Sequence, residues 1–386
     1  MVTPARSGFL VKESEWVEQS TATARDRSGA AVLLSQPVVW ANLVSGCQAG
    51  GVTSPLMVFA AAEHDEHSTP DWHPEHRGRL DAALAGIHES GLDEATEWRV
   101  PEQVSVEDLV RVHDRDYVLE VERFCAAGGG ELDPDTIATS GSWATARRSA
   151  GAVLGAIDAL RADECDVAFA GGRPPGHHAV RDRAMGFCLF NNAAVGAAQI
   201  TAAGEKVAVI DWDVHHGNGT QDIFYDDPNV LYVSTHESPL YPGTGMLRET
   251  GGGAGAGTNV NLPFPAGTAG DTYRAAFDEV VVPVIERFSP DWLIISAGFD
   301  GHRDDPLAGL RLTAGDYADM ARRLQSLVAA RRLMVVLEGG YDLGALTRSV
   351  GSTLSALVGG AYRPETASTG EIGMPTVTAA KQLWEL

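Results

Sequence analysis

Short β-branched apolar runs alternate with longer segments of helical periodicity, and this alternation constrains the fold more than any other feature of the sequence. Runs of the buried-strand kind cover residues 56–61, 166–170, 207–210, 230–235, 292–296 and 333–338. Helical patterns lie near residues 142–162, 189–203, 270–288 and 314–331. Strands that alternate with helices indicate a parallel sheet. We therefore expect an α/β fold, a single large domain whose central, mostly parallel β-sheet is flanked by helices on both faces.

Polar side chains gather where these runs end. They are His177, His178, Asp211, Asp213, His215, Asp300 and Tyr341. In parallel α/β sheets, ligands bind beyond the carboxyl ends of the strands, so we expect these side chains to share one site. A single Asp-x-His segment could equally be a hydrogen-bonded network that only holds a loop. Recurrence at several strand ends favours a functional site.

The segment DWDVHHGNG at 211–219 has the spacing of a metal site. Side chains alternate along an extended segment, so Asp213 and His215 point the same way. With Asp300 they would offer one cation two carboxylates and one imidazole, and would leave a position open for water. This set suits Zn²⁺, and its oxygen content means that Fe²⁺, Co²⁺ or Mn²⁺ could also be held.

The remaining groups supply proton transfer and charge stabilisation. A neutral histidine of the His177–His178 pair can accept a proton from metal-bound water and later donate one to a leaving amine. Asp211 and Asn218 are placed to fix the imidazole tautomers. Tyr341, after two glycines, can donate a hydrogen bond to an oxyanion. These parts describe metal-assisted hydrolysis of an amide.

The composition argues against several other classes of function. The formal net charge of −23 would repel nucleic acid and favour cationic substrates. No apolar run is long enough to span a membrane, and the N-terminus lacks the pattern of a secretory signal, so we expect a cytoplasmic protein. The scattered residues Cys47, Cys125, Cys165 and Cys188 form no CxxC pair, which indicates buried or incidental thiols rather than disulfides or a zinc ribbon.

Regions without catalytic motifs also carry expectations. Residues 1–55 are predicted to be an N-terminal arm packing on a catalytic domain of residues 56–386. Pro74 and Glu75 are expected in the first turn of a helix, and the segment 128–136, GGGELDPDT, is expected to be a loop carrying Asp133 and Asp135. The irregular spacing of four histidines in a polar stretch suggests surface or rim positions for His64, His67, His73 and His76.

Six motifs, taken as an ordered set, resemble those of the zinc-dependent histone deacetylases, in particular class II-like enzymes and bacterial relatives that include acetylpolyamine amidohydrolases. They are RPPGHHA, GFCLFNN, DWDVHHGNGTQ, STHESPLYPGTG, SAGFDGHRDDPL and LEGGYD, and the resemblance spans residues 56–357. It implies an arginase/deacetylase-like domain in which Asp213, His215 and Asp300 bind zinc. It also implies that His178 is the general base and acid, that His177 is its electrostatic partner paired to Asp211, and that Tyr341 polarises the acetyl carbonyl.

The resemblance further implies a substrate rim and a second cation. Asp135 would hydrogen-bond the substrate backbone. The residues that would line an acyl-lysine tunnel are Gly186, Phe187, Tyr241 and Leu307. A structural K⁺ would lie near Asp211, Asp213, His215, Ser234 and Thr235. Asn218, where class I enzymes have aspartate, looks like class II; it leaves His178 without a carboxylate partner and so lowers its expected basicity.

We therefore expect a metal-dependent amidohydrolase that removes an acetyl or other acyl group from an amine such as acetyl-lysine, by attack of zinc-bound water. An acetylpolyamine or another small-molecule amide is an alternative substrate: Leu307 offers no partner for an ammonium group, whereas the net charge of −23 favours cations. A catalytically silent protein that binds acyl ligands is an alternative of another class. A binuclear ureohydrolase would need further bridging carboxylates. The expected partner is an acylated lysine or amine, without nucleic acid or membrane, and a homo-oligomer is possible.

Overall fold

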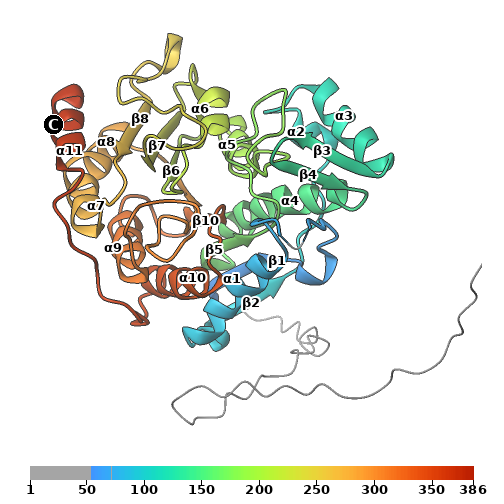
Figure 1. Ribbon diagram of the computed structural model, residues 1–386, viewed down its shortest axis with the longest axis horizontal. Helices are drawn as coiled ribbons and strands as arrows, with labels where there is room; N and C mark the ends of the chain where they lie inside the picture. The colour runs from blue at the N-terminus through green and yellow to red at the C-terminus, as the bar shows by residue number, and fades with distance from the viewer. Residues whose placement is uncertain (1–53, 71) are drawn as a thin grey trace, which may run out of the picture. The chain divides into compact units, whose positions relative to one another are not determined.

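The computed structural model describes residues 54–70 and 72–386. Its centre is an eight-stranded sheet in the order β2-β1-β5-β10-β9-β6-β7-β8, and neighbouring strands run parallel (Figure 1). The strands are β1 (Ser54–Ala60), β2 (Thr96–Arg99), β5 (Cys165–Gly171), β6 (Val207–Asp211), β7 (Val230–Glu237), β8 (Asn259–Phe264), β9 (Trp292–Ala297) and β10 (Leu333–Leu337). The expected α/β fold with a parallel sheet is confirmed.

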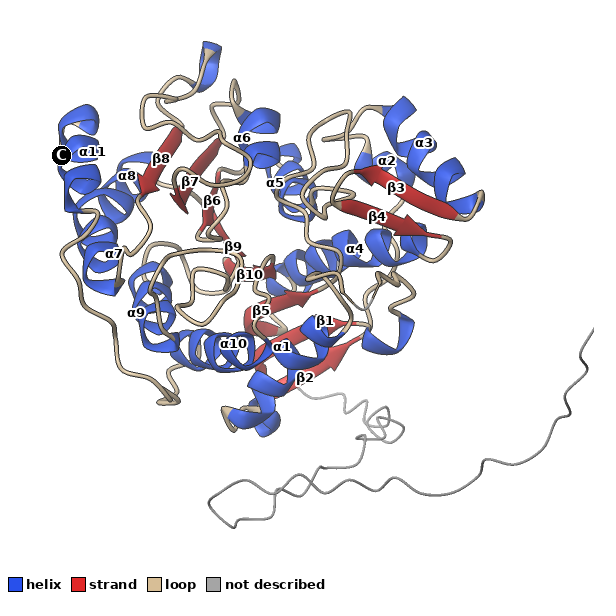
Figure 2. Cartoon of the chain, viewed as in Figure 1, coloured by secondary structure: helices blue, strands red, loops and turns tan. Residues whose placement is uncertain are grey.

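Helices cover both faces of this sheet, as Figure 2 shows. They are α1 (Gly78–Glu89), α2 (Val106–Leu109), α3 (Arg115–Ala126), α4 (Ser142–Arg161), α5 (Asn192–Ala202), α6 (Asn218–Phe224), α7 (Gly270–Ala276), α8 (Val282–Phe288), α9 (Ala314–Gln325), α10 (Leu343–Leu357) and α11 (Met374–Trp384). A π-helical turn (Phe277–Val281) joins α7 to α8, and 3₁₀ turns cover Ala62–His64, Asp93–Ala95 and Gly253–Gly255. The helical pattern expected near residues 270–288 is therefore confirmed, with a π-helical turn in its middle.

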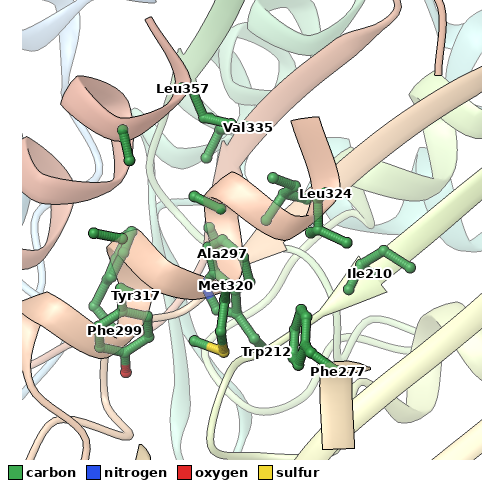
Figure 3. Close-up of a cluster of buried hydrophobic side chains, with 14 of the residues drawn as sticks. Ile210, Trp212, Phe277, Ala297, Phe299, Tyr317, Met320, Leu324, Val335 and Leu357 are labelled. Atoms are coloured by element: carbon green, nitrogen blue, oxygen red, sulfur yellow. The ribbon is translucent and has the colours of Figure 1, made fainter. Parts of the chain in front are cut away.

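The core consists of two apolar clusters, one on each face of the sheet. Leu293 and Ile295 of β9 enter the cluster that also holds α1, α9 and α10, whereas Ile294 between them enters the cluster of α4 and α5. Figure 3 shows part of the first cluster, where Met320 of α9 lies near Trp212. Strands that bury both faces give continuous apolar runs, which is why the sequence predicted them.

The elements that the sequence did not predict include β2, β8, α6 and α10. Strands β2 and β8 are the two edges of the sheet. Edge strands tolerate charged residues and proline, and β8 includes Pro263 and two asparagines. Helix α10 is rich in glycine, serine and threonine, which are weak helix formers. Residues 349–357 are buried without a break, so tertiary packing rather than propensity stabilises this helix.

Two local expectations about secondary structure are wrong. The expected glycine-rich loop is a hairpin of β3 (Gly129–Asp133) and β4 (Thr136–Thr139), with Asp135 at its turn. Cross-strand bonds between these segments override the loop signal of the glycines. Helix α1 begins at Gly78, after Pro74 and Glu75, because the Glu75 carboxylate is bonded to two arginines in the core rather than exposed at a helix end.

Two of the four loop histidines are buried rather than at the surface or rim. Nδ1 of His67 lies 2.7 Å from the Ser142 hydroxyl. The ring nitrogens of His73 lie 3.0 Å and 3.1 Å from the carbonyl oxygens of Glu75 and Asp135. Buried polar groups need partners, and two of these partners, Ser142 and Asp135, come from distant segments that the local spacing does not reveal. His64 is exposed, as expected, and His76 is half-buried.

The expectations for the N-terminal arm and for the cysteines concern residues that the structure describes only in part. Of the expected N-terminal arm, only Ser54 and Pro55 are described, and both belong to β1. Cys125, Cys165 and Cys188 are buried free thiols, as expected, while Cys47 lies outside the described residues. Among the described residues, none of the helices has the length and apolar character that a membrane span requires.

Candidate active site

Four adjacent strands, in the order β5-β10-β9-β6, carry the predicted catalytic residues in the loops after their carboxyl ends. These residues are His177 and His178 after β5, Tyr341 after β10, Asp300 after β9, and Asp213 and His215 after β6. The carboxyl ends of parallel strands meet at one edge of the sheet. Strand order therefore brings together residues that are far apart in the sequence.

Asp213, His215 and Asp300 form a buried group that could hold a metal ion, with ligand atoms within 4.8 Å of one another. Nδ1 of His215 lies 3.1 Å from Oδ1 of Asp213 and 3.2 Å from Oδ2 of Asp300. Backbone groups orient both carboxylates: the N–H of Gly339 donates to Asp213 at 2.8 Å, and the N–H of Val214 donates to Asp300 at 2.8 Å.

The electrostatics of this group fit a cation. Burial and the neighbouring Asp213 carboxylate raise the pKa of Asp300 to about 7. Burial opposes the charge on His215, but hydrogen bonds to Asp213 and Asp300 outweigh it and raise the pKa of His215 to about 10. Two buried carboxylates at this distance need positive charge between them, which a divalent ion bound to both would supply.

The adjacent histidines occupy different electrostatic environments. Nδ1 of His177 lies 3.0 Å from Oδ2 of Asp211, whereas Nδ1 of His178 lies 2.8 Å from the amide oxygen of Asn218. Burial disfavours charge on His177, but the carboxylates of Asp213 and Asp211 outweigh it and raise its pKa to about 10. Burial and the charge on His177 hold the pKa of His178 well below its usual value. His178 is thus the neutral member of the pair, with Nε2 available as a proton acceptor.

Tyr341 follows a turn of two glycines. Gly340 has φ of +121°, a region that favours glycine. The Tyr341 ring lies 5.7 Å from the Phe187 ring, and the guanidinium of Arg79 lies 4.8 Å from its centroid. Burial holds the pKa of the Tyr341 phenol well above its usual range. The phenol therefore stays protonated and can donate a hydrogen bond.

The predicted rim residues approach this group from other loops. Oδ1 of Asp135 accepts the N–H of Gly186 at 3.1 Å, which connects the β3–β4 turn to the loop that carries Phe187. The Tyr241 ring is perpendicular to the His178 ring at 5.1 Å. Leu307 is half-buried in the loop after β9, and its N–H donates to Asp305.

The residues expected near potassium lie on β6, β7 and the loop after β6. Asp211 is paired with Ser234 in the register of these strands. Among the described residues, the buried hydroxyl of Thr235 has no hydrogen-bond partner.

Comparison with known proteins identifies the family of this chain. Residues 73–357 match the family described as the histone deacetylase domain. The chain belongs to the histone deacetylase family. It is 41% identical over 315 residues to a probable deacetylase of Archaeoglobus fulgidus, covering 78% of this chain and 87% of the relative. It is also 41% identical over 289 residues to a histone deacetylase-like amidohydrolase of Pseudomonas aeruginosa, covering 73% and 74%. The crystal structure of the HDA15 HD domain superposes with a TM-score of 0.80 at 36% identity, covering 86% of this chain and 95% of that one. The expected family resemblance is confirmed.

Glu338 of this histone deacetylase family member was not among the site residues predicted from the sequence. Its buried carboxylate accepts the N–H groups of Gly176 and His177 at 2.7 Å and 3.1 Å and the hydroxyl of Ser296 at 3.0 Å. It therefore holds the histidine loop from the neighbouring strand β10. A charged residue at the end of the run LMVVLE is the signal that could have identified it, because an unpartnered buried charge is costly.

Arg79 and Asp305 were missed as well. Arg79 donates to the carbonyl of Gly340 at 2.6 Å and to that of Glu338, on both sides of Gly339. Asp305 accepts the N–H of Tyr341 at 2.6 Å. Arg79 lies in a segment that was interpreted only through its apolar helical pattern, and Asp305 lies in a segment from which only the rim residue Leu307 was taken. The sequence carries no local signal for these contacts.

A second group of possible metal ligands, His302, Asp304 and Glu365, is an ion-pair network. Arg348 donates to Asp304 at 2.9 Å, and Arg303 donates to Glu365 at 3.0 Å. These arginines already neutralise the carboxylates, so this group is a poor place for a cation.

Proposed function

We propose that this protein is a metal-dependent deacetylase: an amidohydrolase that removes an acetyl or other acyl group from an amine such as acetyl-lysine. The observation that carries the proposal is the convergence of three possible metal ligands with a neutral histidine and a protonated tyrosine, all from adjacent strand ends. Membership of the histone deacetylase family supports the same reaction class.

Asp213, His215 and Asp300 would hold the metal, which we propose to be Zn²⁺. Bound there, Zn²⁺ would act as a Lewis acid that lowers the pKa of water toward about 7 and polarises the acyl carbonyl. Fe²⁺ and Co²⁺ are alternatives for the same oxygen-rich set.

Proton transfer falls to the two histidines. Nε2 of His178 accepts a proton from the attacking water and later donates it to the leaving amine. Its Nδ1–H is fixed by Asn218 at 2.8 Å. His177, held by Asp211 at 3.0 Å, remains charged beside it. We propose that His177 stabilises the negative charge that develops on the substrate.

Tyr341 and the rim residues act on the substrate directly. The Tyr341 phenol donates a hydrogen bond to the carbonyl oxygen as negative charge develops there. We propose that the side of the substrate that bears the acyl group is contacted by four residues: Gly186, Phe187, Tyr241 and Leu307. Asp135 would accept an N–H from the substrate backbone.

The proposal also includes a second cation, the enzyme class and the cellular location. We propose a structural K⁺ held by Asp211, Asp213, His215, Ser234 and Thr235, partly through carbonyl oxygens. Asn218 and the RPPGHH motif support a class II-like, bacterial-type enzyme. Cytoplasmic location and the absence of nucleic-acid or membrane partners remain part of the proposal, although one similar plant relative, histone deacetylase 14 of Arabidopsis thaliana, is named chloroplastic.

The test is release of acetate from an acetyl-lysine peptide, an acetylpolyamine and a longer acyl-lysine peptide. Zinc-loaded protein should turn over at least one of them, and a chelator should abolish turnover until zinc is restored. D300A should lose both bound zinc and activity, while Y341F should keep zinc and lose about 10²–10³-fold in kcat. D304N, a change to an exposed neighbouring carboxylate, is the matched control.

The panel also separates the alternatives. Preference for the acetylpolyamine would favour a cationic small-molecule substrate, in keeping with the net charge of −23. Stoichiometric zinc without turnover of any amide would refute the deacetylase proposal and favour a protein that only binds acyl ligands.

A further inference from the structure

The turn that carries Tyr341 needs an external restraint. Gly339 and Gly340 precede the tyrosine, and glycine leaves the backbone free to adopt many conformations. The phenol must nevertheless reach one position, because misplacement of a catalytic group by about 1 Å can cost about 10²-fold in rate.

Asp305 supplies a restraint on the backbone of Tyr341 itself. Its Oδ2 accepts the N–H of Tyr341 at 2.6 Å and that of Asp342 at 3.1 Å. Its Oδ1 accepts the N–H of Leu307 at 3.0 Å. Asp305 is 6% exposed, and its carboxylate lies at the N-terminus of α10, where negative charge is favourable.

The hydrogen-bond partners of Asp305 distinguish it from a residue that stabilises the hydrophobic core. Its carboxylate bonds to the turn that carries Tyr341 and to Leu307 in its own loop. Within residues 54–70 and 72–386, no hydrogen bond joins this carboxylate to a strand or to the interior of a helix. Arg79 fixes Gly340 from the opposite side through its carbonyl oxygen. Without Asp305, two N–H groups at the end of a glycine turn would lose their acceptor.

We propose that Asp305 is a positioning residue for Tyr341: by accepting its backbone N–H, it fixes the turn so that the phenol reaches the substrate carbonyl. The inference rests on the proposed function, in which Tyr341 polarises that carbonyl. Asp305 itself does not touch the substrate. Through Leu307, the same carboxylate also joins this turn to the rim loop after β9.

A double-mutant cycle on the full-length, zinc-loaded protein tests the inference. D305A should lower kcat and kcat/KM equally, by about 30–100-fold, with KM and zinc content unchanged. D305N keeps one carbonyl oxygen and should lose only about 3–10-fold. In the Y341F background, D305A should add less than about twofold, because the group through which it acts is already absent.

The neighbouring carboxylate Asp304 provides the matched control. It is 46% exposed and pairs with Arg348, and D304N should leave kcat unchanged. If D305A does not fold, as judged by circular dichroism, the cycle is run with D305N.

The outcomes separate the two proposals. If Y341F is impaired and an Asp305 substitution lowers its kcat by the same factor as in the wild type, Asp305 acts independently and the inference is overturned while the function stands. Wild-type kcat in D305A, or in D305N if it replaces D305A, overturns it too. Full activity of Y341F would refute the proposed role of Tyr341 and, with it, that of Asp305.

Discussion

Two adjacent histidines of the same loop differ in charge, and their hydrogen-bond partners differ as well. His177 faces an Asp211 carboxylate oxygen, while His178 faces the Asn218 amide oxygen. The ring centroids are 4.0 Å apart, so charge on one ring disfavours charge on the other. Negative charge placed beside His177 therefore keeps His178 neutral and able to accept a proton.

Asn218→Asp should reverse part of this difference. A carboxylate at the Asn218 position favours the charged imidazolium and raises the pKa of His178, by about 1 unit or more. A base with a higher pKa is protonated at higher pH, so the acid limb of the kcat/KM profile should move to higher pH. Acetate release between pH 5 and 9 measures this limb.

Asn229→Asp is the control for this substitution. Asn229 is exposed, before β7, and N229D adds the same charge away from the histidines. If N218D leaves the acid limb where it is in the wild type and in N229D, then His178 is not the group whose protonation limits the reaction.

At the scale of elements, the turn after β10 shows how closely the strand ends approach. The Gly339 N–H donates to Asp213 at 2.8 Å. A Cβ added at Gly339 would lie 2.1 Å from Oδ2 of Asp300 and 2.5 Å from Oδ2 of Asp213. Only glycine lets β10 end this close to the carboxylates that follow β6 and β9.

Gly339→Ala should therefore push the carboxylates apart and weaken metal binding, by about 10–100-fold. Zinc content after dialysis against a competing chelator measures the effect, and kcat should fall with it. Gly344→Ala, at an exposed position of α10 where a Cβ would meet only side-chain ends at 3.2 Å and 3.5 Å, should keep full zinc affinity. Equal zinc binding by both variants would contradict this account of the turn.

The same elements show what the sequence could predict. Strands β5, β6, β9 and β10 bury both faces, and their apolar runs identified them. The side chains after them, such as Asp213 and Asp300, were predicted to share one site because parallel strands end at one edge. Strands β2 and β8 at the edges lacked this signal.

Contacts across long sequence separations lay beyond sequence reasoning. Arg79 and Gly340 are 261 residues apart, and Asp305 and Tyr341 are 36 apart. No local period encodes such pairs, because each depends on how separate strands and loops pack. His67 and His73 were misplaced for the same reason: their partners Ser142 and Asp135 come from a later segment.

At the scale of the whole molecule, a buried ionic network connects the loops behind the site. Glu75 is fully buried and accepts from Arg79 at 3.1 Å and from Arg173 at 2.6 Å and 2.7 Å. Arg173 also donates to Asp65 at 2.6 Å. The network thereby joins the loops after β1 and β5 to α1, and through Arg79 to the turn after β10.

Glu75→Gln should destabilise the protein in a pH-dependent way. Burial opposes its charge, but Arg173, His67 and Arg79 together outweigh burial and hold the pKa of Glu75 well below its usual value. A carboxylate whose pKa is lower in the folded state stabilises the fold above its unfolded pKa of about 4.3 and loses this contribution as pH falls through the folded pKa. Between pH 6 and 8, E75Q should lower the free energy of unfolding by about 3–5 kcal/mol, because it removes the carboxylate bonded to buried Arg79 and leaves buried Arg173 with Asp65 alone.

Urea unfolding of the wild type and E75Q from pH 3.5 to 8 measures this difference, which should be constant at neutral pH and shrink below about pH 4.3. Glu97→Gln is the matched control, since Glu97 pairs with Arg99 at the surface, where both side chains are over one third exposed. Exposed pairs contribute about 0–1 kcal/mol. A loss in E75Q that does not change with pH would show that side-chain shape rather than charge accounts for it, and a loss no larger than that of E97Q would show that the network does not hold the loops together.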